Sequence, residues 1–217
     1  MREIRILIIK ELMLEWRQKY AFNGLLLYVG ATVFVCYLSF RQIIDIPTWN
    51  ALFWIIQLFA AVNALAKSFL QESRGRSLYY YTVAHPHHII LSKIIYNFFL
   101  MLLLSFFNLL FYSLLIGNPV DDMGMFILTM ILGSLGLSSV LCMISAIASR
   151  AGNSAGLMPI LSFPVMLPLL MTIIRLSKNA IDGLAWSVSQ SLVLILVSLN
   201  VLIIAMGYLL FPYLWKD

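Results

Sequence analysis

Three imidazole side chains stand within four residues of this sequence, at His85, His87 and His88, on either side of Pro86. Imidazole nitrogens bind haem iron and divalent metals, which raises the hypothesis of a ligand set. The neighbouring residues supply no cysteine or acid to complete such a set. The pattern therefore favours a surface turn, with ligation of haem or a metal as the alternative.

The apolar segments lack the ionisable groups on which membrane enzymes and ion-coupled pumps depend. No Asp, Glu or His falls in the middle of any of them, and no Gly-x-x-x-x-Gly-Lys-Ser/Thr run occurs in the sequence. Coupling ions, protons and catalytic zinc need such side chains, and that run is what cradles ATP in many ATPases. We therefore expect no catalytic residues, metal ligands or directly bound cofactor, and we expect energy for any movement to come from a partner subunit.

The composition is that of a membrane protein. Of the 217 residues 62% are hydrophobic and 11% are charged, whereas soluble domains carry about a quarter charged residues. The apolar runs are continuous over about 20 residues, which is the length of a spanning helix and not the alternating pattern of a barrel strand. The net charge of +5 is spread over short loops, which argues against nucleic-acid binding. The sequence thus predicts an all-α polytopic membrane protein.

Six spans and one interfacial helix are expected within a single transmembrane domain, 1–217. The predicted spans are 20–40, 49–70, 94–116, 123–148, 155–174 and 187–210. Before them, in 1–19, Ile8, Leu12 and Trp16 form one apolar stripe on a segment too charged to span. That pattern predicts a helix lying in the membrane interface among the lipids, with a charged cytoplasmic tail as the alternative.

The distribution of cations predicts the orientation. Of the 14 Lys and Arg residues, three (Arg41, Arg175 and Lys178) fall in loops on one side, which leaves 11 on the side of the N-terminus. Positively charged residues accumulate on the cytoplasmic side of membrane proteins. Both termini are therefore expected in the cytoplasm.

Polar amides occur within the predicted spans and have two interpretations. The residues are Asn23, Gln57, Asn63, Asn97, Asn108 and Asn200. They would either line a substrate path or hydrogen-bond neighbouring helices at about 0.6 kcal/mol each. The second interpretation is favoured for any single residue.

The loop 71–93 is the only connection long and polar enough to have structure of its own. Its first part, 72–81, has helical composition, and Pro86 is expected to fix a turn before the next span. A short helix held by long spans would act as a lever for a soluble motor docked beneath it. The candidate contact residues are Glu72, Arg74, Arg76, Ser77, Leu78, Tyr79, Tyr80 and Pro86. Adjacent tyrosines are typical of protein interfaces, but an interfacial aromatic belt with solvated charges explains them as well.

Three prolines, Pro159, Pro164 and Pro168, fall in the fifth span. Each removes a backbone hydrogen bond and favours a kink, so this span is predicted to be the least regular and able to flex between two packings. The alternative is that membrane helices simply tolerate proline.

Two motifs resemble those of ABC-2-type permeases, and most closely the cytochrome c maturation permease family CcmB, the haem-exporter B family. The first comprises Glu72, Ser77, Leu78, Pro86 and Lys93, which match the coupling-helix region. The second comprises Arg150 and Gly152 in a cytoplasmic turn, followed by Phe163, Pro164, Leu167, Pro168, Leu169 and Leu170. Arg76 stands where the family usually has Gly, and Tyr79 where it often has Glu.

The resemblance implies a permease subunit in the bacterial inner membrane, haem as the cargo, and ATP supplied through a partner. The implied partners are a CcmA-like ATPase, a CcmC-like haem-handling subunit, a CcmD-like small subunit and a CcmE-like haem chaperone. Six spans are usually half of such a membrane unit, which implies a homodimer. The alternatives are an ABC-2 permease for a lipid, a drug or a polysaccharide, and a membrane scaffold that transports nothing.

Overall fold

The chain folds into long helices, as seen in a computed structural model that describes all residues except 1, 18, 41–43, 66–84, 151–153 and 217. Its described part contains seven helices and no strand. They are α1 Arg2–Arg17, α2 Lys19–Phe40, α3 Ile46–Leu65, α5 Pro86–Leu115, α6 Met123–Arg150, α7 Ser154–Ile181 and α8 Trp186–Lys216. The prediction of an all-α membrane fold is confirmed.

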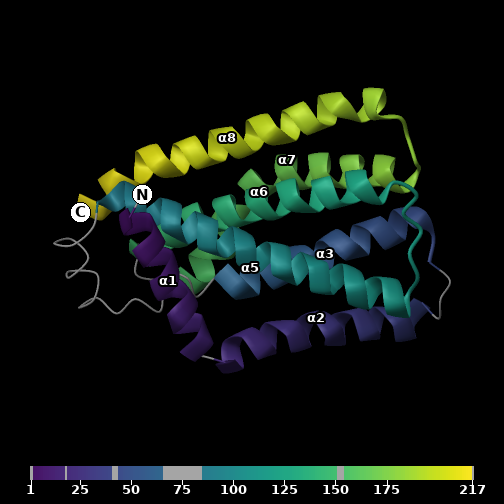
Figure 1. Cartoon of the computed structure of the whole chain (residues 1–217), viewed down its shortest axis with the longest axis horizontal. Coiled ribbons are helices and arrows are strands. Elements are labelled where there is room, and N and C mark those ends of the chain that lie inside the picture. The colour runs from purple at the N-terminus through teal and green to yellow at the C-terminus, as the bar shows by residue number, and fades with distance from the viewer. Residues whose placement is uncertain (1, 18, 41–43, 66–84, 151–153, 217) are drawn as a thin grey trace.

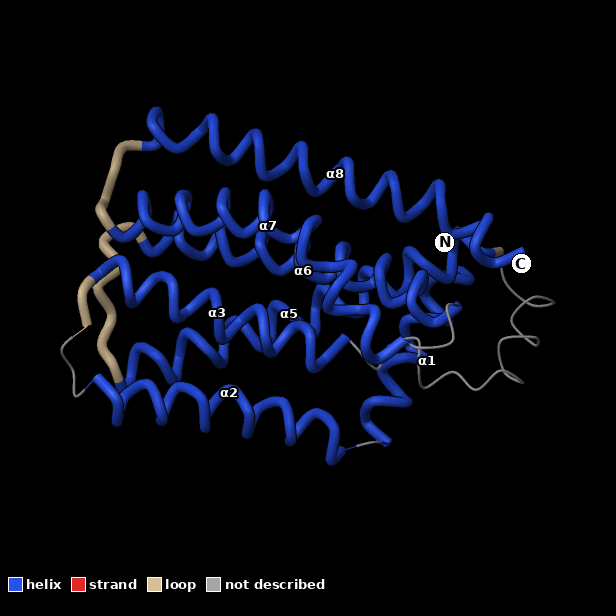
Figure 2. The backbone as a smooth tube through the Cα atoms, turned by 180° about the vertical axis from the view of Figure 1, so that it is seen from behind, coloured by secondary structure: helices blue, strands red, loops and turns tan. Residues whose placement is uncertain are grey.

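Six of these helices, α2, α3, α5, α6, α7 and α8, are long and apolar enough to cross a membrane. They form a bundle whose axes run in broadly the same direction, and α1 lies across one end (Figure 1). Both termini lie at that end, as an even number of spans requires. The loops after α5 and α7 lie at the opposite end (Figure 2). We call the end that holds α1 and both termini the α1 end.

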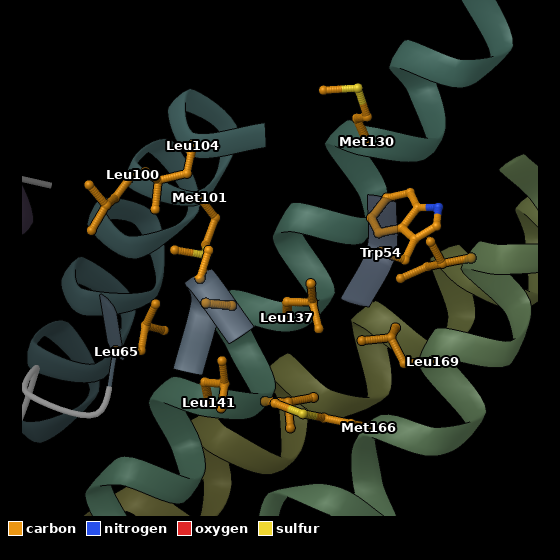
Figure 3. Close-up of a cluster of buried hydrophobic side chains, with 14 of the residues drawn as sticks. Trp54, Leu65, Leu100, Met101, Leu104, Met130, Leu137, Leu141, Met166 and Leu169 are labelled. Atoms are coloured by element: carbon orange, nitrogen blue, oxygen red, sulfur yellow. The ribbon is translucent and has the colours of Figure 1, made fainter. Parts of the chain in front are cut away.

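α6 is the central helix of the bundle. Nearly every side chain from Gly133 to Ala148 is buried, and it contacts α3, α5, α7 and α8. Figure 3 shows labelled side chains of α3, α5 and α7 around α6, with Leu137 and Leu141 facing Met166 and Leu169 of α7. Helices pack closely in membranes where their contact faces carry small residues. The glycines and serines of α6 supply such a face.

Two glycines of α6 mark the closest approaches. A Cβ added at Gly136 would lie 2.7 Å from Leu169 Cδ1 and 2.8 Å from Asn200 Oδ1, so α7 and α8 both press on this position. At Gly133 it would lie 3.0 Å from the ring of Trp54 on α3. Neither site has room for a larger side chain without displacement of a neighbouring helix.

The end opposite α1 is held by polar and aromatic contacts. Trp54 Nε1 donates to Ser177 Oγ at 2.9 Å, and Ser177 Oγ donates to Asn50 Oδ1 at 2.7 Å. Asn50 Nδ2 in turn donates to the Ile174 carbonyl at 2.9 Å. Trp49 stacks on Phe53 with ring centroids 5.8 Å apart. The three hydrogen bonds join α3 to α7, whereas the stacked rings of Trp49 and Phe53 both belong to α3.

Several helices extend beyond the predicted spans. α3 begins at Ile46 instead of 49, α7 continues to Ile181 instead of 174, and α8 continues to Lys216 instead of 210. The largest difference is in α5, which begins at Pro86 and not at 94. At about 1.5 Å per residue its 30 residues extend about 45 Å, beyond the roughly 30 Å hydrocarbon core of a bilayer. The helix is thus longer than an untilted crossing of the hydrocarbon requires.

Candidate functional site

The first turns of α5 meet α1 and the last turns of α8 at the α1 end of the bundle (Figure 1). This junction directly follows the loop that the sequence singles out. Its polar side chains are His85, His87, His88 and Lys93 of α5, Glu3, Lys10 and Glu11 of α1, and Tyr208 of α8. We call this set the α1–α5–α8 junction.

Pro86 begins α5 and does not form a turn before it. The helix has His85 as its N-cap residue, with φ −68° and ψ 137°, and Pro86 at the first helical position. Proline is favoured there because its missing N–H would have no partner in the helix and its φ already suits one. The expected turn was therefore wrong, and 86–93 belongs to the helix.

His87 contacts α8 where proline interrupts the helical hydrogen bonds. Its Nδ1 lies 3.1 Å from the Tyr208 carbonyl, and its ring stacks on the Tyr208 ring with centroids 4.2 Å apart. Pro212 stands four residues after Tyr208 inside α8 and has no N–H to give that carbonyl. Because a carbonyl only accepts, Nδ1 must carry the proton in this contact. His87 thus supplies a donor that α8 lacks.

We expect His87→Phe, which keeps a ring against Tyr208 but removes the donor, to lower the unfolding free energy by about 1 kcal/mol. In a Pro212→Ala background the loss should shrink, because residue 212 then donates to the Tyr208 carbonyl itself. Unfolding in mild detergent, measured as a double-mutant cycle, gives both values. The control is His85→Phe, whose side chain makes no capping bond. Equal losses with and without Pro212 would contradict the assignment.

His88 contacts α1. Its Nδ1 lies 2.6 Å from Glu3 Oε2, and the two side chains are 32% and 50% exposed. The hydrogen bond to His88 holds the pKa of Glu3 below its usual value, with smaller contributions from the charges of His88 and His85. This exposed contact joins the first turn of α1 to the first turn of α5.

A second ion pair joins the same two helices, but this one is buried. Lys93 is only 1% exposed, and its Nζ lies 3.4 Å from Glu11 Oε1. Lys10 Nζ lies 3.0 Å from the same oxygen. Burial by itself raises the pKa of Glu11, but the charges of Lys93 and Lys10 outweigh it and the net pKa is lowered. Glu11 is therefore ionised at neutral pH and balances the charge of Lys93.

Lys93 was expected in the polar loop, and that placement was wrong. The residue lies in the third turn of α5, covered by α1. The local sequence gives little warning, because the carboxylate that pairs with Lys93 comes from a helix 82 residues earlier. An acid in the middle of the apolar half of α1 is the one signal that would have indicated a partner.

The histidines do not gather around a common centre. Within the described ranges no group of three or more His, Cys, Asp or Glu side chains is placed to hold a metal ion. His87 turns to α8 and His88 to α1, while His85 is exposed at the helix end. The alternative of haem or metal ligation gains no support, and two of the histidines link helices.

Polar groups continue from the junction along one face of α5. Asn97 Nδ2 lies 3.8 Å from Cys142 Sγ, and the hydroxyls of Ser105 and Ser134 lie 2.9 Å apart. Further along, Asn108 Nδ2 donates to the Phe53 carbonyl at 3.2 Å.

On α3 and α8 the pattern is the same. Gln57 Nε2 donates to the Met101 carbonyl at 3.3 Å, and Asn200 Nδ2 to the Leu132 carbonyl at 3.1 Å. Asn23 and Asn63 are exposed. The expectation of interhelical hydrogen bonds thus agrees with the four buried amides, although Gln57 Oε1, Asn108 Oδ1 and Asn200 Oδ1 have no hydrogen-bond partner among the residues that the structure describes.

Most of the candidate coupling residues lie outside the described residues. These are Glu72, Arg74, Arg76, Ser77, Leu78, Tyr79 and Tyr80, and Gly152 of the predicted cytoplasmic turn also lies outside them. Arg150 is the last residue of α6, and the three prolines Pro159, Pro164 and Pro168 lie within α7. α7 is one continuous helix in which Pro164 and Pro168 are exposed, so its flexing remains a prediction.

The comparison with known proteins identifies one family. The model of the family described as CcmB protein matches residues 2–211, which is nearly the whole chain and includes every described helix except the end of α8. No curated protein and no solved structure matches significantly.

Proposed function

This chain belongs to the CcmB family, the membrane subunits of haem-export ABC transporters, and we propose that a separate ATPase drives it during c-type cytochrome biogenesis. The observation that carries the proposal is the family match over residues 2–211 together with six membrane-spanning helices. The chain is thus a permease subunit. The proposal assigns the ATP hydrolysis that drives it to another subunit.

In the proposed mechanism, ATP binding draws two ATPase subunits together beneath a homodimer of this chain. Their movement enters through 72–81 and passes along α3, α5 and α7 to the opposite face. There it either exports haem or releases the haem-loaded chaperone. The position of α5 supports this route, because α5 begins directly after the loop and carries polar contacts to α3 and α6 along its length.

The same proposal assigns the partners and the location. A CcmA-like ATPase would bind on the cytoplasmic side, and CcmC-like, CcmD-like and CcmE-like proteins would handle haem with this chain in the bacterial inner membrane. The 11 cations on the side of the termini, out of 14 in all, support a cytoplasmic α1 end.

We expect Arg74→Glu combined with Arg76→Glu to abolish co-purification of the ATPase in mild detergent. Reversal of two charges at an interface replaces attraction with repulsion and costs several kcal/mol. The matched control is Arg175→Glu with Lys178→Glu, two reversals on exposed residues at the other end of the bundle.

Two results would count against the proposal in different ways. Full retention of the ATPase by the Arg74 and Arg76 variant would refute the docking assignment. Normal c-type cytochromes in cells without this chain would refute the haem role and favour another cargo, such as a lipid, a drug or a polysaccharide.

A further inference from the structure

α1 is fixed to α5 at two points and leads directly into α2. Glu3 pairs with His88, and Glu11 pairs with Lys93. Residues 3 and 11 lie about 12 Å apart along α1, and residues 88 and 93 about 7.5 Å apart along α5. Two contacts at this separation hold α1 against rotation on α5. A single residue, 18, separates the end of α1 from the start of α2.

The buried contact between Glu11 and Lys93 joins α1 to another helix of the protein, and a helix that only anchors the chain to lipid would not need it. A helix that merely lies on the membrane turns its apolar face to the lipid and leaves its acids in water. Here Glu11 faces α5, whereas Ile6 and Met13 are 59% and 67% exposed. α1 therefore has an exposed apolar face and a second face on which the carboxylate of Glu11 contacts Lys93.

α1 contributes to the burial of Lys93. An ammonium group taken out of water is stable only when a carboxylate compensates it. Glu11 and the start of α1 supply both the charge and the cover. If α5 moves, α1 must move with it or expose Lys93 to a new environment. The pair thus connects the two helices.

We propose that Glu11 and Lys93 are positioning residues that carry movement from the start of α5 through α1 into α2. The inference rests on the proposed function, because the movement is the one that the ATPase imposes on the loop before α5. It adds a second route beside the one along α3, α5 and α7. By this route a movement of α1 displaces the first turn of α2. Besides α1, α2 contacts α5 and α3, and much of the rest of its surface is exposed.

The test uses the complete membrane complex with its ATPase and compares Glu11→Lys, Lys93→Glu and the combined charge swap. Two readouts are needed besides co-purification of the ATPase. One is c-type cytochrome formed per ATP hydrolysed. The other is the ATP-dependent labelling rate of a thiol introduced by Ser39→Cys, at an exposed position near the far end of α2. Lys178→Glu, which reverses an exposed lysine of α7, is the matched control.

We expect each single reversal to retain the ATPase, to lower cytochrome formation per ATP by about tenfold, and to abolish the ATP-dependent change at residue 39. The charge swap should restore both. A merely structural role would instead lower the amount of complex and its ATP hydrolysis together.

The inference is overturned if the single variants couple normally, if the swap is no better than either single change, or if the variants lose the complex itself. If the unmodified chain retains no ATPase, the proposed function fails first and the inference falls with it. These outcomes distinguish a failure of the proposed coupling through α1 from a failure of the proposed ATPase-driven function.

Discussion

Gly136→Leu is expected to prevent stable folding of the bundle, with a loss of about 3 kcal/mol or more in unfolding free energy. Even a single added carbon would lie 2.7 Å from Leu169 and 2.8 Å from Asn200. Both neighbours are buried, so they cannot swing into open space. A leucine at this position must therefore push α7 or α8 away from α6. The measurement is the monodisperse fraction and the thermal unfolding of the purified chain in mild detergent.

Gly24→Leu is the matched control for that change. An added Cβ at Gly24 in α2 meets nothing within 4 Å, and the residue is exposed. Leucine has a better helix propensity than glycine by nearly 1 kcal/mol, so the control variant should be as stable as the unmodified chain or slightly more so. Equal behaviour of the two leucine variants would show that α6, α7 and α8 do not pack closely at Gly136.

Trp54→Ala should cost about 3–5 kcal/mol, which is typical for removal of a buried large aromatic side chain. Trp54 is 1% exposed, its ring covers Gly133 of α6, and its Nε1 donates to Ser177 Oγ. The change leaves a cavity between α3 and α6 and deprives Ser177 of a donor. Trp54→Phe keeps most of the volume and should cost much less.

Trp186→Ala provides the comparison, because Trp186 begins α8 with 54% of its surface exposed. Its removal should change the unfolding midpoint little. If Trp186→Ala lowered the unfolding free energy as much as Trp54→Ala does, the close packing of Trp54 would add nothing to stability beyond the apolar character of its side chain.

The number of spans and their approximate places could be predicted from sequence because they depend on continuous apolar length alone. The start of α5 could not. Charge and histidine content made 86–93 read as a loop, whereas α1 packs beside it and provides the burial and the carboxylate that a helix with Lys93 needs. Such a partner comes from tertiary structure and leaves no local pattern.

The junction shows the same limit in its histidines. Their spacing indicated either ligands or a turn, and the sequence near them gave no reason to look towards residue 208. Pro212 was a usable signal, because a proline inside a helix always deprives the carbonyl four residues earlier. Which donor replaces the missing N–H depends on how α5 and α8 meet, and periodicity alone does not reveal that.

The hydroxyl groups of α6 bear on how the chain is built during synthesis. Thr129 Oγ1 donates to the Met125 carbonyl at 2.8 Å, and Ser138 and Ser139 both donate to the Leu135 carbonyl, at 2.9 Å and 2.7 Å. These bonds lie within one helix, so they can form as soon as it does. The innermost span thus brings these three hydroxyls into the lipid already satisfied, whereas the hydroxyl of Ser134 meets that of Ser105 only when α5 lies beside it. The amides of α3, α5 and α8, in contrast, find their acceptors only when another helix lies beside them, so these spans complete their hydrogen bonding during assembly of the bundle.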